Sequence, residues 1–266
     1  MWWDRGNDQG PRAILAALEN PRRHARRAGG AQAVCRQLAA RIDQTLLKPA
    51  ATQEDIRQLC AEAVRWGFAA VVVNPCHVRQ AAGLLAGSGV VVASVAGFPL
   101  GASLPEVKRL EAERALDDGA AEVDMVMALG ALRAGETAVV EEDVRGVARA
   151  CRKHGALLKV ILECALLNDE EKRLGARLAV RAGADFVKTS TGFVSHLPQG
   201  GATAEDVALL RAVVGRKIGV KAAGGIRTLA DAAKMLAAGA SRIGTSAGVA
   251  ILEEFLVLLR DSPDSC

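Results

Sequence analysis

Residues 184–192 read ADFVKTSTG, a stretch with the apolar character of a buried strand and a lysine in its middle. Alternate side chains of a strand point to opposite faces, so Phe186, Lys188 and Ser190 share one face. A buried ammonium is costly unless it is paired or neutral, and a neutral lysine is a nucleophile. Taken alone, the stretch leaves open a second interpretation, in which Lys188 lies on an edge strand in contact with water.

The same kind of apolar run recurs along the chain. We expect eight strands, at residues 42–47, 69–73, 90–96, 121–127, 157–162, 184–189, 218–222 and 242–245. Amphipathic segments with helical spacing separate most of them, at residues 54–66, 104–118, 136–154, 169–182, 204–213 and 229–238. Eight apolar strands alternating with helices predict a parallel (β/α)8 TIM barrel. An open dinucleotide-binding sheet is disfavoured because no G-x-G-x-x-G follows the first strand.

Local signals place some element boundaries. Thr52 and Asp55 have the spacing of a capping box that opens the helix at 54–66. Glycines at the expected left-handed caps follow five helices, at Gly67, Gly119, Gly155, Gly183 and Gly239. We therefore divide the chain into a basic, partly helical extension (1–40), the barrel (41–260) and a short tail (261–266).

The composition indicates the location of the protein and the classes of partner that we do not expect. The chain has 266 residues and a formal net charge of +4, with six arginines in the first 27 residues. We interpret this arm as a solvated extension and expect no nucleic-acid or membrane partner, because no aromatic residues alternate with its arginines. No run of 18 apolar residues and no secretory signal occur, and the six cysteines form no C-x-x-C pair. We therefore expect a cytoplasmic protein with reduced thiols and no metal site.

Charged residues interrupt five of the apolar strands: Asp43, Asp124, Lys159, Lys188 and Lys221. In a (β/α)8 barrel the active site lies at the carboxyl ends of the strands, where such residues meet. Neighbouring ammonium groups and desolvation both favour a neutral lysine, which attacks carbonyls to form a Schiff base. A nearby carboxylate transfers protons through water. The alternative is a salt-bridged core without chemistry.

Two glycine-containing loops end the last strands, KAAGGI at 221–226 and RIGTSAG at 242–248. Glycines that precede a helix expose backbone N–H groups, and phosphate sites after strands seven and eight recur in this fold. We expect an anion site here, although tight turns also require glycine.

These segments together resemble the bacterial deoxyribose-phosphate aldolases. The motifs that carry the resemblance are IDQTLLKPAAT (42–52), VVVNPCHV (71–78), VVASVAGFPLG (91–101), GAAEVDMVMALGAL (119–132), LKVILE (158–163), ADFVKTSTGF (184–193), GVKAAGGIRT (219–228) and RIGTSAG (242–248). The resemblance implies a class I aldolase that needs no metal or cofactor. It would interconvert 2-deoxy-D-ribose 5-phosphate with D-glyceraldehyde 3-phosphate and acetaldehyde.

Roles follow from the motif match. Lys188 would form the Schiff base, Lys221 would lower its pKa, and Asp124 would transfer protons with Lys159 and a water. Asp43 would bind the substrate hydroxyl region or hold the lysine network. The phosphate would lie among Gly224, Gly225, Gly244, Thr245 and Ser246, with Thr191 and Gly192 nearby. We also expect a homo-oligomer, a dimer.

The chain departs from the family pattern in four places. Gln44 stands where a histidine is usual, and Phe193 stands where some members carry a basic residue that contacts phosphate. The segment 194–201 is longer than in relatives, and no tyrosine is present to reach the site from the C-terminus. Two alternatives stay open. One is another class I aldolase that acts on a phosphorylated sugar, and the other is a catalytically silent barrel that binds a sugar phosphate or a partner protein through its basic arm.

Overall fold

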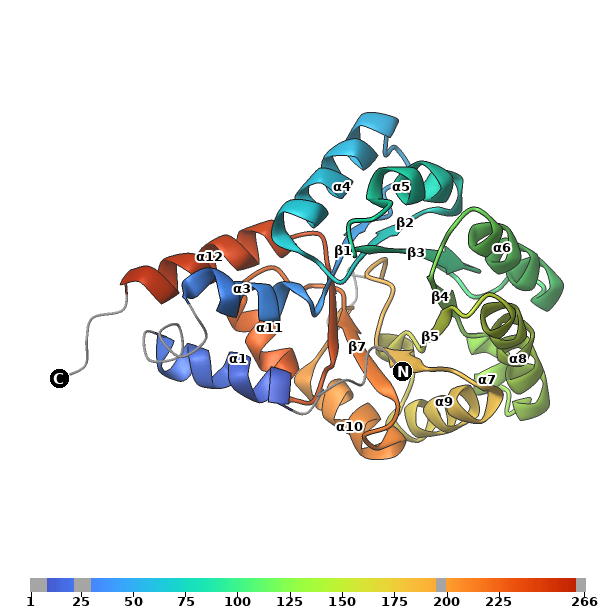
Figure 1. Cartoon of the computed structure of the whole chain (residues 1–266). Helices are drawn as coiled ribbons and strands as arrows, with labels where there is room; N and C mark the ends of the chain where they lie inside the picture. The colour runs from blue at the N-terminus through green and yellow to red at the C-terminus, as the bar shows by residue number, and fades with distance from the viewer. Residues whose placement is uncertain (1–8, 22–29, 195–199, 262–266) are drawn as a thin grey trace.

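The computed structural model describes residues 9–21, 30–194 and 200–261. Eight parallel strands form a closed barrel in sequence order, β1 pairing with β8. They are β1 (Ile42–Leu46), β2 (Ala70–Val73), β3 (Val91–Ala96), β4 (Glu122–Val126), β5 (Leu157–Ile161), β6 (Phe186–Lys188), β7 (Gly219–Ala223) and β8 (Arg242–Thr245). Figure 1 shows the helices around this barrel. The predicted (β/α)8 fold is confirmed.

The helices are α1 (Gln9–Glu19), α3 (Ala31–Ala39), α4 (Gln53–Trp66), α5 (Val78–Leu85), α6 (Pro105–Asp117), α7 (Leu129–Arg133), α8 (Thr137–Lys153), α9 (Asp169–Ala182), α10 (Ala204–Val214), α11 (Leu229–Ala237) and α12 (Gly248–Asp261). Short 3-10 turns lie at Pro75–His77 and Cys164–Leu166. The sequence analysis placed no helix at α5 or α12.

Side-chain caps fix where several helices begin. The predicted capping box of α4 is present: the Thr52 hydroxyl accepts from the Asp55 N–H, and the Asp55 carboxylate accepts from the Thr52 N–H. The same reciprocal pair opens α11, formed by Thr228 and Asp231. At the other end of α4, Gly67 has φ 74°, a conformation that glycine adopts without strain.

The barrel interior has an apolar part and a charged part. Ala70, Val72, Ala93 and Val95 of β2 and β3 pack together on one side. Charged residues of β1 and β4–β8 occupy the rest. The ring of Phe186 also lies inside, over Gly219, where a Cβ atom would stand only 2.0 Å from it. The main apolar core lies outside the strands, beneath the helices.

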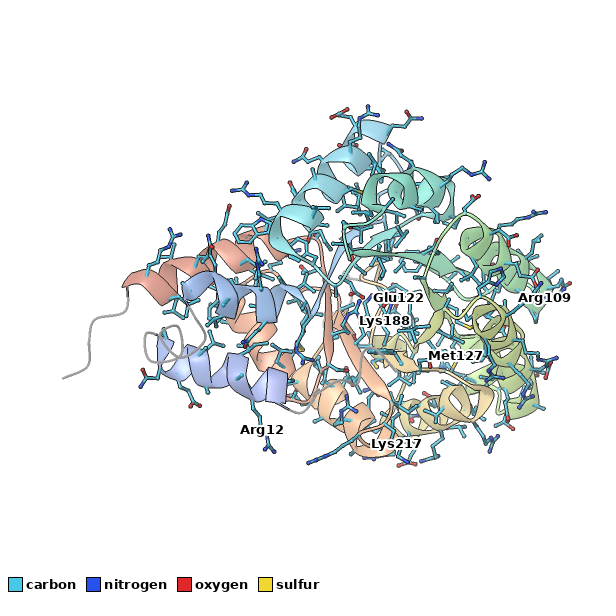
Figure 2. All side chains as sticks on the ribbon, in the orientation of Figure 1. Arg12, Arg109, Glu122, Met127, Lys188 and Lys217 are labelled. Carbon is cyan, nitrogen blue, oxygen red and sulfur yellow. The ribbon has the colours of Figure 1, made fainter. Side chains whose placement is uncertain are left out.

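The described part of the N-terminal extension is docked onto the barrel. Helix α1 contacts α11 and α3, and α3 contacts α12 (Figure 1). Ile14 and Ala17 of α1 are fully buried, while Arg12 points away from the barrel (Figure 2). The sequence analysis favoured a solvated arm because no aromatic residues alternate with its arginines, but α1 has an apolar face that packs. Within the described residues, no helix is long and apolar enough to cross a membrane.

Candidate active site

Seven charged side chains are buried together inside the barrel, each at most 5% exposed. They are Asp43, Glu122, Asp124, Lys159, Lys188, Lys221 and Arg242. Strand register explains why they meet: Lys188 pairs with Lys221 and Lys221 with Arg242, while Asp124 pairs with Lys159. Figure 2 shows Glu122 and Lys188 within the barrel, whereas Arg109 and Lys217 stand at its outer surface.

Six of these side chains form a closed ring of alternating charge. Arg242 binds Asp43, whose Oδ2 lies 2.6 Å from the Lys221 Nζ. The Lys221 Nζ also lies 2.7 Å from Asp124 Oδ2, and Asp124 Oδ1 accepts from Lys159 at 2.8 Å.

The Lys159 Nζ lies 2.5 Å from Glu122 Oε2, and that oxygen is 3.2 Å from Arg242 Nη2. The ring therefore closes through Glu122 and Arg242. We call these six residues the charge ring.

Lys188 is attached to the charge ring at one point. Its Nζ donates to Asp124 Oδ2 at 2.9 Å, an oxygen that also accepts from Lys221. Burial lowers the pKa of Lys188 to about 8; Asp124 opposes this shift, and the positive charges of Lys221 and Lys159 add to it. Because the ring is neutral when its six groups are ionised, Lys188 carries the surplus charge and is the cation that most readily loses its proton.

The other pKa shifts keep the ring ionised. Burial alone would raise the pKa of Asp124, yet Lys159, Lys188 and Lys221 hold it well below its usual range. Burial alone would lower the pKa of Lys159, but Asp124, Glu122 and Asp43 raise it. Asp124 and Lys159 therefore stay charged at neutral pH beside Lys188.

A cavity of about 1050 Å³ opens above the charge ring at the carboxyl ends of the strands. Of the seven buried charged residues, only Lys188 lines it. Thr191, Gly192, Gly224, Gly225, Gly244, Thr245 and Ser246 also line it. Asp43, Asp124, Lys159 and Lys221 are not among its lining residues. The cavity therefore presents one buried nitrogen of the cluster to a ligand.

One end of the cavity has the features of an anion site. The N–H groups of Gly224, Gly225 and Ser246 have no protein hydrogen-bond acceptor within the described ranges. Gly224 and Gly225 have φ values of 90° and 77°, which glycine adopts freely.

Three further cations line the same cavity as these free N–H groups. Lys48, Arg227 and Lys234 line the same cavity, and none of them forms an ion pair in the described part of the chain. Free N–H groups and unpaired cations together suit a phosphate.

Gln44, which departs from the family pattern, supports this loop. Its Oε1 accepts from the Gly248 N–H at 3.0 Å, and its Nε2 donates to the Ser246 carbonyl at 3.5 Å. The amide thus links β1 to the turn between β8 and α12.

Glu163 holds the loop after β6. The Thr191 hydroxyl donates to its carboxylate, and the Thr191 N–H donates to Oε2 at 3.1 Å. The Thr191 hydroxyl oxygen in turn accepts from the Phe193 N–H at 3.1 Å. Glu163 has φ 51°, the one positive value among the described non-glycine residues, and burial raises the pKa of its carboxyl group. Phe193 is half exposed and contacts the Phe98 ring edge-on at 5.1 Å.

The structure brings the sequence-predicted site residues into two layers, the five strand charges below and the loop residues around the cavity. Sequence reasoning missed three residues as members of the site: Glu122, Arg242 and Glu163. The alternation that selected Asp124 also places Glu122 on the same face, so the signal was present. The part of the longer loop at 195–199 lies outside the described residues.

Comparison with known proteins identifies the family. The profile of the DeoC/LacD family aldolases matches residues 37–254. The deoxyribose-phosphate aldolase of Geobacillus sp. is 55% identical over 216 residues, covering 81% of this chain and 95% of that protein. The Thermococcus kodakarensis deoxyribose-phosphate aldolase is 54% identical over 220 residues, covering 82% and 96%.

A solved structure agrees along almost the whole chain. The tetrameric deoxyribose phosphate aldolase of Aeropyrum pernix has a TM-score of 0.78 and 40% identity, covering 93% of this chain and 98% of that one. The family profile matches the whole barrel, and the Geobacillus and Thermococcus relatives are more than 50% identical to it in sequence. The chain therefore belongs to the DeoC/LacD aldolase family.

Proposed function

We propose that this protein is a deoxyribose-phosphate aldolase that cleaves 2-deoxy-D-ribose 5-phosphate through a Schiff base on Lys188. The observation that carries the proposal is the position of Lys188, the surplus cation of the buried cluster and the member that lines the cavity. The names of its relatives give the substrate.

The reaction begins when the Lys188 amine attacks the aldehyde carbon of the open-chain sugar. Loss of water from the resulting carbinolamine leaves a protonated imine. Asp124, through a water, takes the proton of the hydroxyl on C3 as the bond between C2 and C3 breaks, and D-glyceraldehyde 3-phosphate leaves. The bonding electrons move into the imine to give an enamine. Protonation of the enamine carbon and hydrolysis release acetaldehyde and restore the amine.

The free N–H groups of Gly224, Gly225 and Ser246 bind the phosphate in this proposal. The cations Lys48, Arg227 and Lys234 lie around the same cavity and replace the basic residue that position 193 lacks. Asp43 acts within the charge ring: it binds Arg242 and Lys221 and does not line the cavity.

Trapping the imine tests the covalent step. We expect incubation with acetaldehyde and sodium borohydride to add one reduced two-carbon group, mapped by mass spectrometry to Lys188. The Lys188→Met variant should show no adduct and no turnover, while Lys217→Met, at an exposed lysine, should keep both. Turnover without modification of Lys188 would refute the proposal, and a panel of phosphorylated sugars separates this enzyme from other class I aldolases.

We propose that the protein forms a homodimer. Leu100, Leu104, Val107 and Leu110 are exposed close together along the chain, on the loop before α6 and on α6 itself. Such apolar exposure is typical of an interface. Light scattering gives the molecular mass of the native protein and of the Leu110→Glu variant. We expect a dimer for the native protein and a lower mass for the variant, and a monomeric native protein would refute the proposal.

For location, we propose the cytoplasm, where Cys35, Cys60, Cys76, Cys151 and Cys164 would keep the free thiols that the structure has. Cys266 lies outside the described residues. Fluorescence of a tagged copy in intact cells tests this location.

A further inference from the structure

We propose that Glu122 and Arg242 are positioning residues of the reaction, which close the charge ring and thereby decide whether Lys188 carries a proton. This inference rests on the proposed function, because it explains how the Lys188 amine becomes available. It adds a role for two residues that the substrate does not reach.

The contacts of Glu122 and Arg242 are confined to the ring. Glu122 Oε2 lies between the Lys159 Nζ at 2.5 Å and Arg242 Nη2 at 3.2 Å, and its Oε1 lies 3.4 Å from Arg242 Nη1. Arg242 also donates from Nε and Nη2 to Asp43 Oδ1. Neither residue lines the cavity. Each therefore acts on a ligand only through the lysines and aspartates that it holds.

Charge balance connects the pair to Lys188. Asp43, Glu122 and Asp124 supply three negative charges, and Lys159, Lys221 and Arg242 supply three positive ones. Removing one charge leaves a buried net charge of one sign, with little water to screen it. A ring with net negative charge favours the ammonium form of Lys188, and one with net positive charge favours the free amine.

Charged groups from several elements act on Lys188 and on Arg242. Asp124, Lys159 and Lys221 face Lys188 from β4, β5 and β7, and Glu163 acts on it from the end of β5. Asp43, Glu122, Asp124 and Lys159 act on Arg242, and Arg41 is a further cation close enough to interact with it. Arg41 is not a ring member, since its guanidinium donates to the Ser241 carbonyl. It therefore offers a matched control for the loss of one nearby positive charge.

The test compares Glu122→Gln, Arg242→Met and the double variant. For each, the pH dependence of borohydride trapping by acetaldehyde gives the midpoint at which Lys188 becomes reactive. We expect Glu122→Gln to move the midpoint down and Arg242→Met to move it up, each by about one pH unit. The double variant, whose ring is again neutral, should return to within a few tenths of a unit of the native midpoint. Arg41→Met should move the midpoint much less than Arg242→Met, because Arg41 has no contact with the ring carboxylates.

A structural role alone predicts lower stability and lower rates with unchanged midpoints. Shifts of the same sign in both single variants, or no restoration in the double variant, would overturn the proposal. Glu122→Gln is isosteric and tests the proposal even if Arg242→Met does not fold: a midpoint that does not move down would overturn it.

A second measurement separates this inference from the proposed function. Acylation of Lys188 by acetic anhydride across pH, mapped by mass spectrometry, reports the free amine whether or not an imine forms. Opposite shifts of the acylation midpoint in the two single variants would support the proposed role of the charge ring even if no aldolase activity were found. Unchanged midpoints would refute that role even if the enzyme is active.

Discussion

Lys188 and Lys221 occupy paired positions on β6 and β7, and both donate to the same oxygen, Asp124 Oδ2, at 2.9 and 2.7 Å. One carboxylate oxygen thus holds two buried ammonium groups side by side. Their repulsion is reduced when one of them loses its proton. Lys221 is also held by Asp43, whereas Lys188 pairs only with Asp124 among the residues that the structure describes. The proton is therefore lost from the lysine that faces the cavity.

Replacing Lys221 by leucine removes the neighbouring charge that helps to lower the pKa of Lys188. With that pKa at about 8, roughly a tenth of Lys188 is free amine at pH 7. A rise of one to two units would reduce kcat/KM at pH 7 by about 10- to 100-fold, with recovery toward pH 10. A profile measured from pH 6 to 10 checks this, with Lys217→Leu as the control. An unchanged midpoint would exclude the proposed role of Lys221.

Introducing an aspartate at Ser246 places a carboxylate beside the free N–H groups of the expected phosphate site. We expect KM for 2-deoxyribose 5-phosphate to rise by about 100-fold, because two anions compete for the same donors. KM for unphosphorylated deoxyribose should change little. Ser246→Ala keeps the backbone donors without the charge and serves as the control. An equal change for both substrates would place the phosphate elsewhere.

Removing the Glu163 side chain frees Thr191 from its acceptor. We expect Glu163→Ala to raise KM about tenfold, because the N–H and the hydroxyl of Thr191 both lose their buried hydrogen bonds to the carboxylate. Glu163→Gln keeps an acceptor oxygen and should stay within about twofold of the native KM. Steady-state kinetics of both variants provide the comparison, and a glutamine variant as impaired as the alanine variant would contradict the positioning role.

Lys108 and Asp143 form a separate buried ion pair between α6 and α8, with a distance of 2.6 Å and no exposure of either side chain. The Lys108 Nζ also donates to the Val126 carbonyl at the end of β4. Lys108→Ala leaves Asp143 unpaired, and we expect it to lower the free energy of unfolding by about 3–5 kcal/mol. Lys108→Met with Asp143→Leu should cost much less. Urea unfolding measures both, and an equal loss in the two variants would argue against the unpaired charge as the cause.

The strands and their inward faces were predictable from the sequence, because apolar runs and period-two alternation are local properties. These local patterns identified Asp124, Lys159, Lys188 and Lys221 as inward-facing charges. The closure of the ring was not predictable in this way: Glu122 and Arg242 meet because the closed sheet brings β4 and β8 across the interior from each other. Docking of α1 depends likewise on the surface that α11 presents to Ile14.

The charge ring consists of strand residues alone, whereas the free N–H groups and the cations around the cavity belong to loops and to α11. Reactivity and recognition are thus encoded in separate parts of the chain. A designer who exchanges the loops after β7 and β8 can seek other acceptor aldehydes while the nucleophile keeps its electrostatic setting. By the same reasoning, we expect substitutions that admit new substrates to be tolerated in these loops and not in the charge ring.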